Sequence, residues 1–210
     1  MNKNKGFTLI EIAIVITIIG ILLGAILLRS GSVIGNAKTT DTIALVKDLS
    51  AAINDFRSRY HYLPGDLPNA GNDIPGIAVS DPCNISPPGT IGDGKIDPDT
   101  APGIGEATCV AVELVQAGLI KGSTSGIFSR NGTGTPDILV TARRSTGLNQ
   151  LPLTVINEIQ LLKQPCETAQ GIDSKLDDGN FKTGKITASV DTCTPGDSAT
   201  DPVPIIDIAL

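Results

Sequence analysis

Few residues in this chain could do chemistry. The 210 residues include one His and four Cys. No two of these Cys lie within a few residues of each other, and the single imidazole, His61, follows an apolar helical pattern, where a surface or packing role is the simpler explanation. Neither a zinc site nor a Ser-His-Asp arrangement fits this inventory. The chain is therefore not expected to be an enzyme.

The closest approach to a ligand set is an acidic loop with three Asp residues, Asp93, Asp97 and Asp99. Closely spaced carboxylates on a Gly-rich loop can bind calcium, and this loop is the calcium candidate; no other cofactor is expected. Lys95 stands where a further ligand would be needed, and a solvated acidic turn is the alternative. The same two alternatives apply to the adjacent pair Asp177-Asp178.

One carboxylate, Glu11, lies within an apolar stretch near the N-terminus. No charged residue occurs from Ile12 to Leu28, and about 20 apolar residues suffice for a helix that crosses a bilayer. Lys3 and Lys5 precede the stretch, so the positive-inside rule places residues 1–6 in the cytoplasm and everything after Arg29 outside. A carboxylate in such a helix is costly unless it is paired or reaches the headgroups.

The junction before this stretch, Lys5-Gly6-Phe7-Thr8-Leu9-Ile10-Glu11, resembles the processing site of type IV prepilins and type II secretion pseudopilins. In that family a membrane-embedded peptidase cuts after the Gly on the cytoplasmic side and methylates the new amine. The resemblance implies a cut between Gly6 and Phe7. It also implies that Glu11 pairs with the Phe7 amine of a neighbouring subunit as the helices bundle into a filament.

The resemblance divides the chain into a cytoplasmic leader of residues 1–6, a membrane-spanning and filament-core helix of residues 7–30, and a globular domain of residues 31–210 outside the membrane. It implies three kinds of partner: the prepilin peptidase and methyltransferase, the inner-membrane assembly machinery, and further copies of this chain in a helical homopolymer. The precursor is expected in the inner membrane as a single-pass protein. The mature chain is expected in an extracellular filament, or in the periplasm if it is a pseudopilin.

The four Cys are expected to form disulfides, because the domain that carries them lies in an oxidising environment and their number is even. Four Cys allow three pairings. The sequential pairing is favoured because each bridge would close one turn-rich segment; it joins Cys83 to Cys109 and Cys166 to Cys193.

The apolar periodicity predicts the elements that carry these residues. Apolar side chains recur at three- and four-residue steps up to Phe56, which indicates an amphipathic helix continuous with the apolar stretch, from about residue 7 to Tyr60. Pro64-Gly65 ends it, and Gly31 and Gly35 predict a bend or a melted turn within it. Residues 64–105 are rich in Pro, Gly, Asn and Asp and predict loops.

Further along the chain, the pattern predicts a second helix over Glu106–Lys121 and strands over Asp137–Arg143, Lys185–Asp191 and Val203–Ala209. Leu153–Lys163 fits a helix or a strand, and Pro152 at its start favours the helix. The predicted fold class is α+β and type IV pilin-like: a long N-terminal helix packed on a small antiparallel sheet, with loop-rich, disulfide-bonded insertions.

The chain is acidic, with a formal net charge of −6 and no long basic run, so nucleic acid is not an expected partner. Three functions remain. The favoured one is a structural subunit of a type IV pilus or related surface filament. The second is a pseudopilin or minor pilin of a type II secretion or DNA-uptake system. The third is a membrane-anchored binding domain that is never cut and never polymerises.

Overall fold

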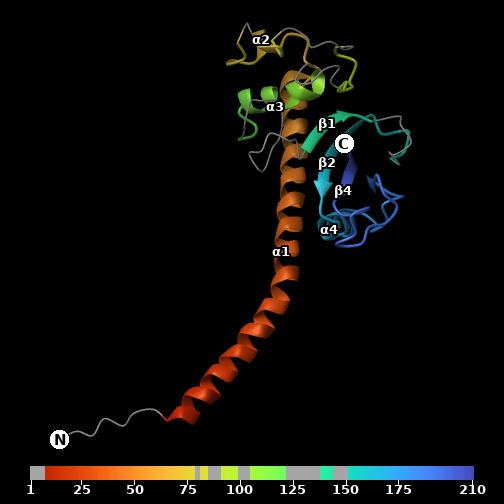
Figure 1. The fold of residues 1–210 in the computed structure, drawn as a ribbon. Coiled ribbons are helices and arrows are strands. Elements are labelled where there is room, and N and C mark those ends of the chain that lie inside the picture. The colour runs from red at the N-terminus through yellow and green to blue at the C-terminus, as the bar shows by residue number, and fades with distance from the viewer. Residues whose placement is uncertain (1–7, 79–80, 85–90, 99–104, 122–137, 144–150) are drawn as a thin grey trace, which may run out of the picture. The chain divides into compact units, whose positions relative to one another are not determined.

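The computed structural model describes residues 8–78, 81–84, 91–98, 105–121, 138–143 and 151–210, with the side chains of residues 25–35 left out of that description. Two compact units divide the chain: an N-terminal unit, Met1–Lys38, and a C-terminal unit, Thr39–Leu210. The elements follow one another in the order α1, α2, α3, β1, β2, α4, β3, β4 (Figure 1). The mixed α+β class predicted from the sequence is confirmed.

Helix α1 extends over Leu9–Tyr60. Its last residue is the one predicted from the Pro64-Gly65 stop signal. The helix continues through Gly31 and Gly35 without interruption, so the predicted melted turn is absent. At the C-terminal end, His61 adopts φ +66° and its backbone N–H donates to the Arg57 carbonyl oxygen at 2.9 Å. This left-handed residue closes the last helical turn.

Within the C-terminal unit, the second half of α1 buries the stripe that the periodicity predicted. Val46, Leu49, Ile53 and Phe56 are at most 4% exposed. The Phe56 ring packs on the Tyr60 ring with centroids 4.5 Å apart. These side chains belong to one hydrophobic core that also takes in side chains of every strand of the sheet.

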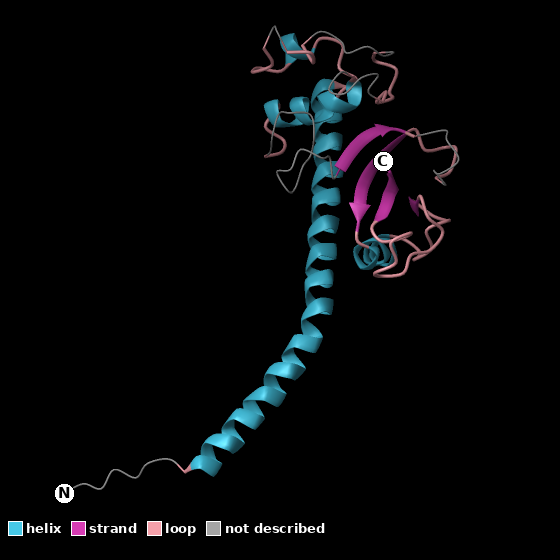
Figure 2. Cartoon of the chain, in the orientation of Figure 1, coloured by secondary structure: helices cyan, strands magenta, loops and turns pink. Residues whose placement is uncertain are grey.

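The sheet consists of β1 (Ile138–Ala142), β2 (Asn157–Gln164), β3 (Ile186–Ala188) and β4 (Val203–Ala209). Figure 2 draws the strands as magenta arrows. Their order is β1-β2-β4-β3 and all three pairings are antiparallel. Ile159 and Leu161 of β2 contribute to the core. The residues that alternate with them are polar yet also buried: Gln160 Nε2 donates to Glu158 at 2.7 Å and to Asp207 at 3.1 Å.

The helix favoured for Leu153–Lys163 was a wrong prediction, because most of this segment forms β2. Glu158 and Gln160 alternate with Ile159 and Leu161, which is the two-residue period of a strand. Hydrogen bonding to β1 on one side and β4 on the other makes β2 a central strand. Pairing with two neighbours therefore outweighs the helix-start signal of Pro152.

Two of the three further helices, α2 and α3, lie between α1 and β1, and α4 connects β2 to β3. Helix α3 covers Glu106–Gln116 and ends five residues earlier than predicted, where Gly118 adopts φ +72°. The sequence did not predict α2 (Ala70–Asp73) or α4 (Cys166–Leu176). Helix α3 contacts β1, and α4 contacts β3 and β4. Strand β1 is one residue shorter at each end than predicted, β3 covers three of its seven predicted residues, and β4 has its predicted bounds.

Candidate functional site

The described part of the N-terminal segment begins with a reciprocal cap on α1. The Thr8 backbone N–H and hydroxyl donate to Glu11 Oε2 at 2.8 and 2.7 Å, and the Glu11 backbone N–H donates to Thr8 Oγ1 at 3.4 Å. Thr at the residue before the helix and Glu three residues later form a capping box. Glu11 therefore stabilises the start of the helix while its side chain remains exposed. Gly6 and Phe7 lie outside the described residues.

From Leu9 to Leu23, α1 exposes its large apolar side chains on all sides. The large ones between Leu9 and Leu23 are from 48% exposed, at Ile19, to 88% exposed, at Leu9. Exposed apolar surfaces of this extent mark contacts with a membrane or with other proteins. Among the residues that the structure describes in full, it contains no helix with enough length and apolar character to cross a membrane.

In the acidic loop, two backbone N–H groups bond to the carboxylate of Asp66. Asp66 accepts backbone N–H groups from Gly92 and from Gly94, the latter at 2.9 Å. Burial raises the pKa of Asp66, and these two hydrogen bonds act against that rise. Asp93 Oδ1 accepts the backbone N–H of Lys95 at 2.8 Å. In the described segments, Asp93 and Asp97 do not join a third ligand-bearing group within metal-binding distance; Asp99 lies outside those segments.

Two buried carboxylates of α3 escaped the sequence analysis. Glu113 Oε2 accepts the backbone N–H of Gly65 at 2.8 Å, and Glu106 Oε2 accepts that of Asp97 at 2.7 Å. The second oxygen of each has no hydrogen-bond partner in the described part of the chain. Burial raises the pKa of Glu113 to about 8 and that of Glu106 to about 7, in each case against the lowering effect of the one backbone N–H.

Gly65 explains how these carboxylates become buried. Its φ is +88°, and a Cβ at this position would overlap the carbonyl oxygen of Glu106. Only glycine allows the turn after α1 to approach α3 so closely. The seven-residue spacing of Glu106 and Glu113 places both on the same helical face as apolar core residues, a signal that could have revealed their burial.

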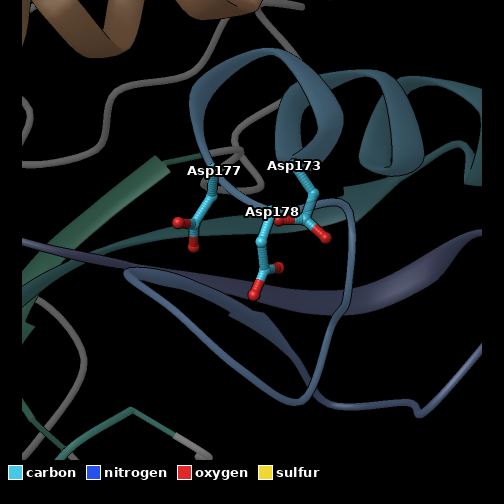
Figure 3. Close-up of side chains that lie close together, drawn as sticks. All are labelled: Asp173, Asp177 and Asp178. Atoms are coloured by element: carbon cyan, nitrogen blue, oxygen red, sulfur yellow. The ribbon is translucent and has the colours of Figure 1, made fainter.

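A second group of carboxylates lies at the end of α4 (Figure 3). One ligand oxygen from each of Asp173, Asp177 and Asp178 lies within 4.8 Å of the others. Asp173 is completely buried, and neither of its oxygens accepts a hydrogen bond of ordinary geometry from the described residues. Burial, then the negative charges of Asp178 and Asp177, raise its pKa to about 6, against a smaller opposing effect of the Gly179 backbone N–H.

The other two members of this group are held by the loop that follows. Asp177 Oδ2 accepts the backbone N–H groups of Lys185 and Ile186, the latter at 2.8 Å. Asp178 accepts the backbone N–H of Asn180 at 2.9 Å and the hydroxyl of Thr183. The sequence drew attention to Asp177 and Asp178. It did not group Asp173 with them, because α4, the helix that places Asp173 one turn before Asp177, was not predicted.

Both expected disulfides are present. Cys83 is bonded to Cys109 of α3, and Cys166 at the start of α4 is bonded to Cys193. Each bridge closes a segment of similar length, with sequence separations of 26 and 27. All four Cys are used, which confirms the sequential pairing.

Comparison with known families identifies the N-terminal segment. Residues 1–27 match the family model described as the prokaryotic N-terminal methylation motif. The chain carries a type IV prepilin-type cleavage and methylation motif. The matched residues include the basic leader, the Gly6-Phe7 junction and the capping box of Thr8 and Glu11. No curated protein and no solved structure matches the chain.

This methylation motif occurs in the precursors of type IV pilin-like proteins and of pseudopilins. Proteins that carry it are structural subunits. The motif implies processing by a prepilin peptidase and assembly into a filament in general terms. It accordingly indicates a membrane-anchored precursor and then a surface filament.

Proposed function

We propose that the mature chain is a pilin, a non-enzymatic structural subunit of a type IV pilus or related surface filament. Prepilin peptidase removes residues 1–6, and the chain then polymerises through the first half of α1. The observation that carries the proposal is the methylation motif at residues 1–27, which extends into the start of α1, where the large apolar side chains from Leu9 to Leu23 are exposed.

The apolar surface supplies the driving force for assembly. The large apolar side chains from Leu9 to Leu23 are about half or more exposed in the isolated chain, and burial of apolar surface stabilises by about 25 cal/mol per Å². Lipid covers this surface in the precursor, which spans the inner membrane with its N-terminus in the cytoplasm. The helices of neighbouring copies cover it in the filament.

Charge pairing supplies the register. Cleavage after Gly6 leaves a positively charged amine on Phe7, at the start of the same helix that carries Glu11. In a core of low dielectric, an unpaired charge is costly. Glu11 of one copy therefore pairs with the Phe7 amine of the next, and this contact forms only at one axial offset. A head-to-tail contact of this kind does not close on itself, so it generates a helical fibre.

The capping box defines the experiment, because Glu11 already has a structural role in the described helix. Glu11→Ala removes both the cap and the charge. Glu11→Gln keeps a side chain that can cap α1 and removes only the charge. We expect both variants to be inserted and cut in normal amounts, as intact mass shows, and both to yield few or no filaments by electron microscopy of the cell surface.

Thr8→Ala is the matched control, because it removes the hydroxyl half of the cap and leaves the Glu11 charge in place. We expect it to form filaments close to wild-type yield. Normal filaments from Glu11→Gln, with failure of Glu11→Ala and Thr8→Ala, would mean that helix capping is the role of Glu11 and would contradict the charge-pair proposal.

Surface filaments and membrane fractions from these cells also distinguish a pilin from the alternative functions. A pseudopilin or minor pilin of a secretion or DNA-uptake system carries the same motif, but it would not be the bulk component of surface filaments. The globular domain expected from residue 31 onward is large for a core pseudopilin, which favours the pilin. A chain that is never cut would instead retain Met1–Gly6 in the membrane fraction.

A further inference from the structure

We propose that Asp173, Asp177 and Asp178 form a calcium site at the turn between α4 and β3. This inference does not depend on the function of the N-terminal segment, because it concerns residues of the C-terminal unit alone. It also differs from the loop of Asp93, Asp97 and Asp99 that the sequence suggested.

The spacing of the three carboxylates fits the size of the ion. Asp173 and Asp177 are four residues apart at the end of a helix, so they lie on one face, and Asp178 adjoins them. One oxygen from each lies within 4.8 Å of the others (Figure 3). Calcium binds oxygen at about 2.3–2.6 Å, so two ligands on opposite sides of the ion are roughly 4.6–5.2 Å apart. Magnesium, at about 2.0–2.1 Å, requires a tighter group.

The second and independent observation is the state of Asp173. Its side chain is completely buried, and neither carboxylate oxygen accepts a hydrogen bond of ordinary geometry from the described residues, the nearby Gly179 backbone N–H having only a small opposing effect on its pKa. A buried carboxylate without a partner costs several kcal/mol, so such groups are paired or bind a metal. At least one oxygen of Asp173 lies close to the carboxylates of Asp177 and Asp178, where it can serve as a ligand.

The local charges also favour a cation. All three carboxylates lie at the C-terminal end of α4, where the helix dipole attracts positive charge and opposes negative charge. In the part of the chain that the structure describes, no Lys or Arg forms an ion pair with any of the three; Lys182 in the following loop pairs instead with Asp191 at 2.6 Å. A bound calcium ion would neutralise this concentration of negative charge.

The surrounding backbone holds the ligands in place. Asp177 uses one oxygen, Oδ2, to accept the N–H groups of Lys185 and Ile186, which leaves Oδ1 for the ion. Gly184 has φ +87°, and a Cβ there would overlap the Asp177 carboxylate. Asp173 is buried, Asp177 is half-buried and Asp178 is exposed. An ion can therefore enter the site from the solvent at Asp178. Waters and loop carbonyls would complete its coordination.

Calcium binding would therefore connect the end of α4 to the start of β3, the short edge strand of the sheet. The experiment uses the full chain in detergent, freed of metal with a chelator, and titrates it with calcium chloride or magnesium chloride. We expect a calcium dissociation constant on the order of 10⁻⁴–10⁻³ M, as in extracellular calcium modules. We also expect a rise of several degrees in the unfolding midpoint at millimolar calcium, and weaker effects of magnesium. No binding heat and no shift with calcium would overturn the proposal.

Two variants locate the ion. Asp173→Asn removes a buried ligand charge and should weaken calcium binding at least about tenfold, without lowering the unfolding midpoint measured in chelator. Asp178→Asn changes an exposed side chain, so it keeps the test valid if Asp173→Asn does not fold; it should also weaken binding.

The matched control is the double variant Asp93→Asn/Asp97→Asn, which should bind calcium as the wild type does. Loss of binding in this control, with normal binding by Asp173→Asn and Asp178→Asn, would place the ion in the sequence-predicted loop and would contradict the site at α4.

Discussion

The two halves of α1 differ in how their apolar residues are stabilised. Between Leu9 and Leu23 the large apolar side chains are 48–88% exposed, whereas Val46, Leu49, Ile53 and Phe56 are at most 4% exposed. The second half packs within its own chain against the sheet. From Leu9 to Leu23 the helix has no such partner in the described chain, and this is the surface that the proposed filament would bury. One continuous helix thus combines a surface for assembly with a component of a folded domain.

Two glutamates show the same difference. Glu11 in the first half is exposed, and its carboxylate accepts two hydrogen bonds from Thr8. Glu113 in the C-terminal unit is completely buried, with one oxygen bonded to Gly65 and the other without a partner in the described residues. The first carboxylate remains available to a partner in an assembly. The second is enclosed by its own domain and favours the protonated form.

The largest expected effect separates the two halves of α1. Phe56→Ala should lower the free energy of unfolding of the C-terminal unit by about 3–5 kcal/mol, because it leaves a cavity in the core. Ile16→Ala, at a side chain that is 61% exposed, should change it by less than about 0.5 kcal/mol. Denaturant unfolding of the full chain in detergent measures both. Equal losses would contradict the division into an assembly half and a folded half.

The disulfides should stabilise the C-terminal unit by a slightly smaller amount. Cys83→Ala/Cys109→Ala opens a bridge with a sequence separation of 26, for which loop-closure entropy predicts a loss of about 3.5 kcal/mol. Unfolding in denaturant at matched pH measures this loss. As a control, the native unreduced protein should show no reaction with a thiol reagent, since all four Cys are bonded. A loss below about 1 kcal/mol would mean that packing alone holds the loop region against α3.

Glu113 should give the C-terminal unit a pH-dependent stability. Its pKa is raised from 4.5 to about 8, so the folded state binds a proton that the unfolded state releases above about pH 4.5. Stability is therefore full at lower pH and falls as the pH rises toward 8, by roughly 2–4 kcal/mol between pH 5 and 8. Glu113→Gln should weaken this dependence and be more stable than the wild type at pH 8.

Unfolding of both proteins across this pH range provides the measurement. Glu167→Gln changes an exposed glutamate of α4 and should retain the wild-type dependence. If Glu113→Gln instead kept the full decline in stability, another group would be its source.

The sequence predicted those elements whose periodicity is long or strictly alternating. Helix α1 ends at Tyr60 as expected, and β1, β3 and β4 lie within their predicted segments. Segment Leu153–Lys163 was assigned to a helix because its start signal was local, whereas the pairing that makes it β2 comes from distant strands. Helix α4 was missed because its buried face consists mainly of small and polar residues around Ile172.

The candidate sites also differ in whether their residues could be selected from the sequence alone. The methylation motif is local in sequence, so Gly6, Phe7 and Glu11 could be selected before any fold was known. The buried carboxylate Asp173 could not, because a sequence pattern treats Asp as a surface residue, and only tertiary packing encloses it. The Asp93 loop illustrates the reverse: its glycines hold Asp66 through Gly92 and Gly94, a structural role that its sequence did not suggest.

The most direct test of the central claim is the intact mass of the chain in filaments sheared from the cell surface. The account predicts a chain of Phe7–Leu210 as the principal component, with one added methyl group on its amine and with the hydrogens of two disulfides missing until reduction. A chain that still carries Met1–Gly6, or filaments that lack this chain while the uncut form remains in the membrane, would contradict the claim that it is a processed filament subunit.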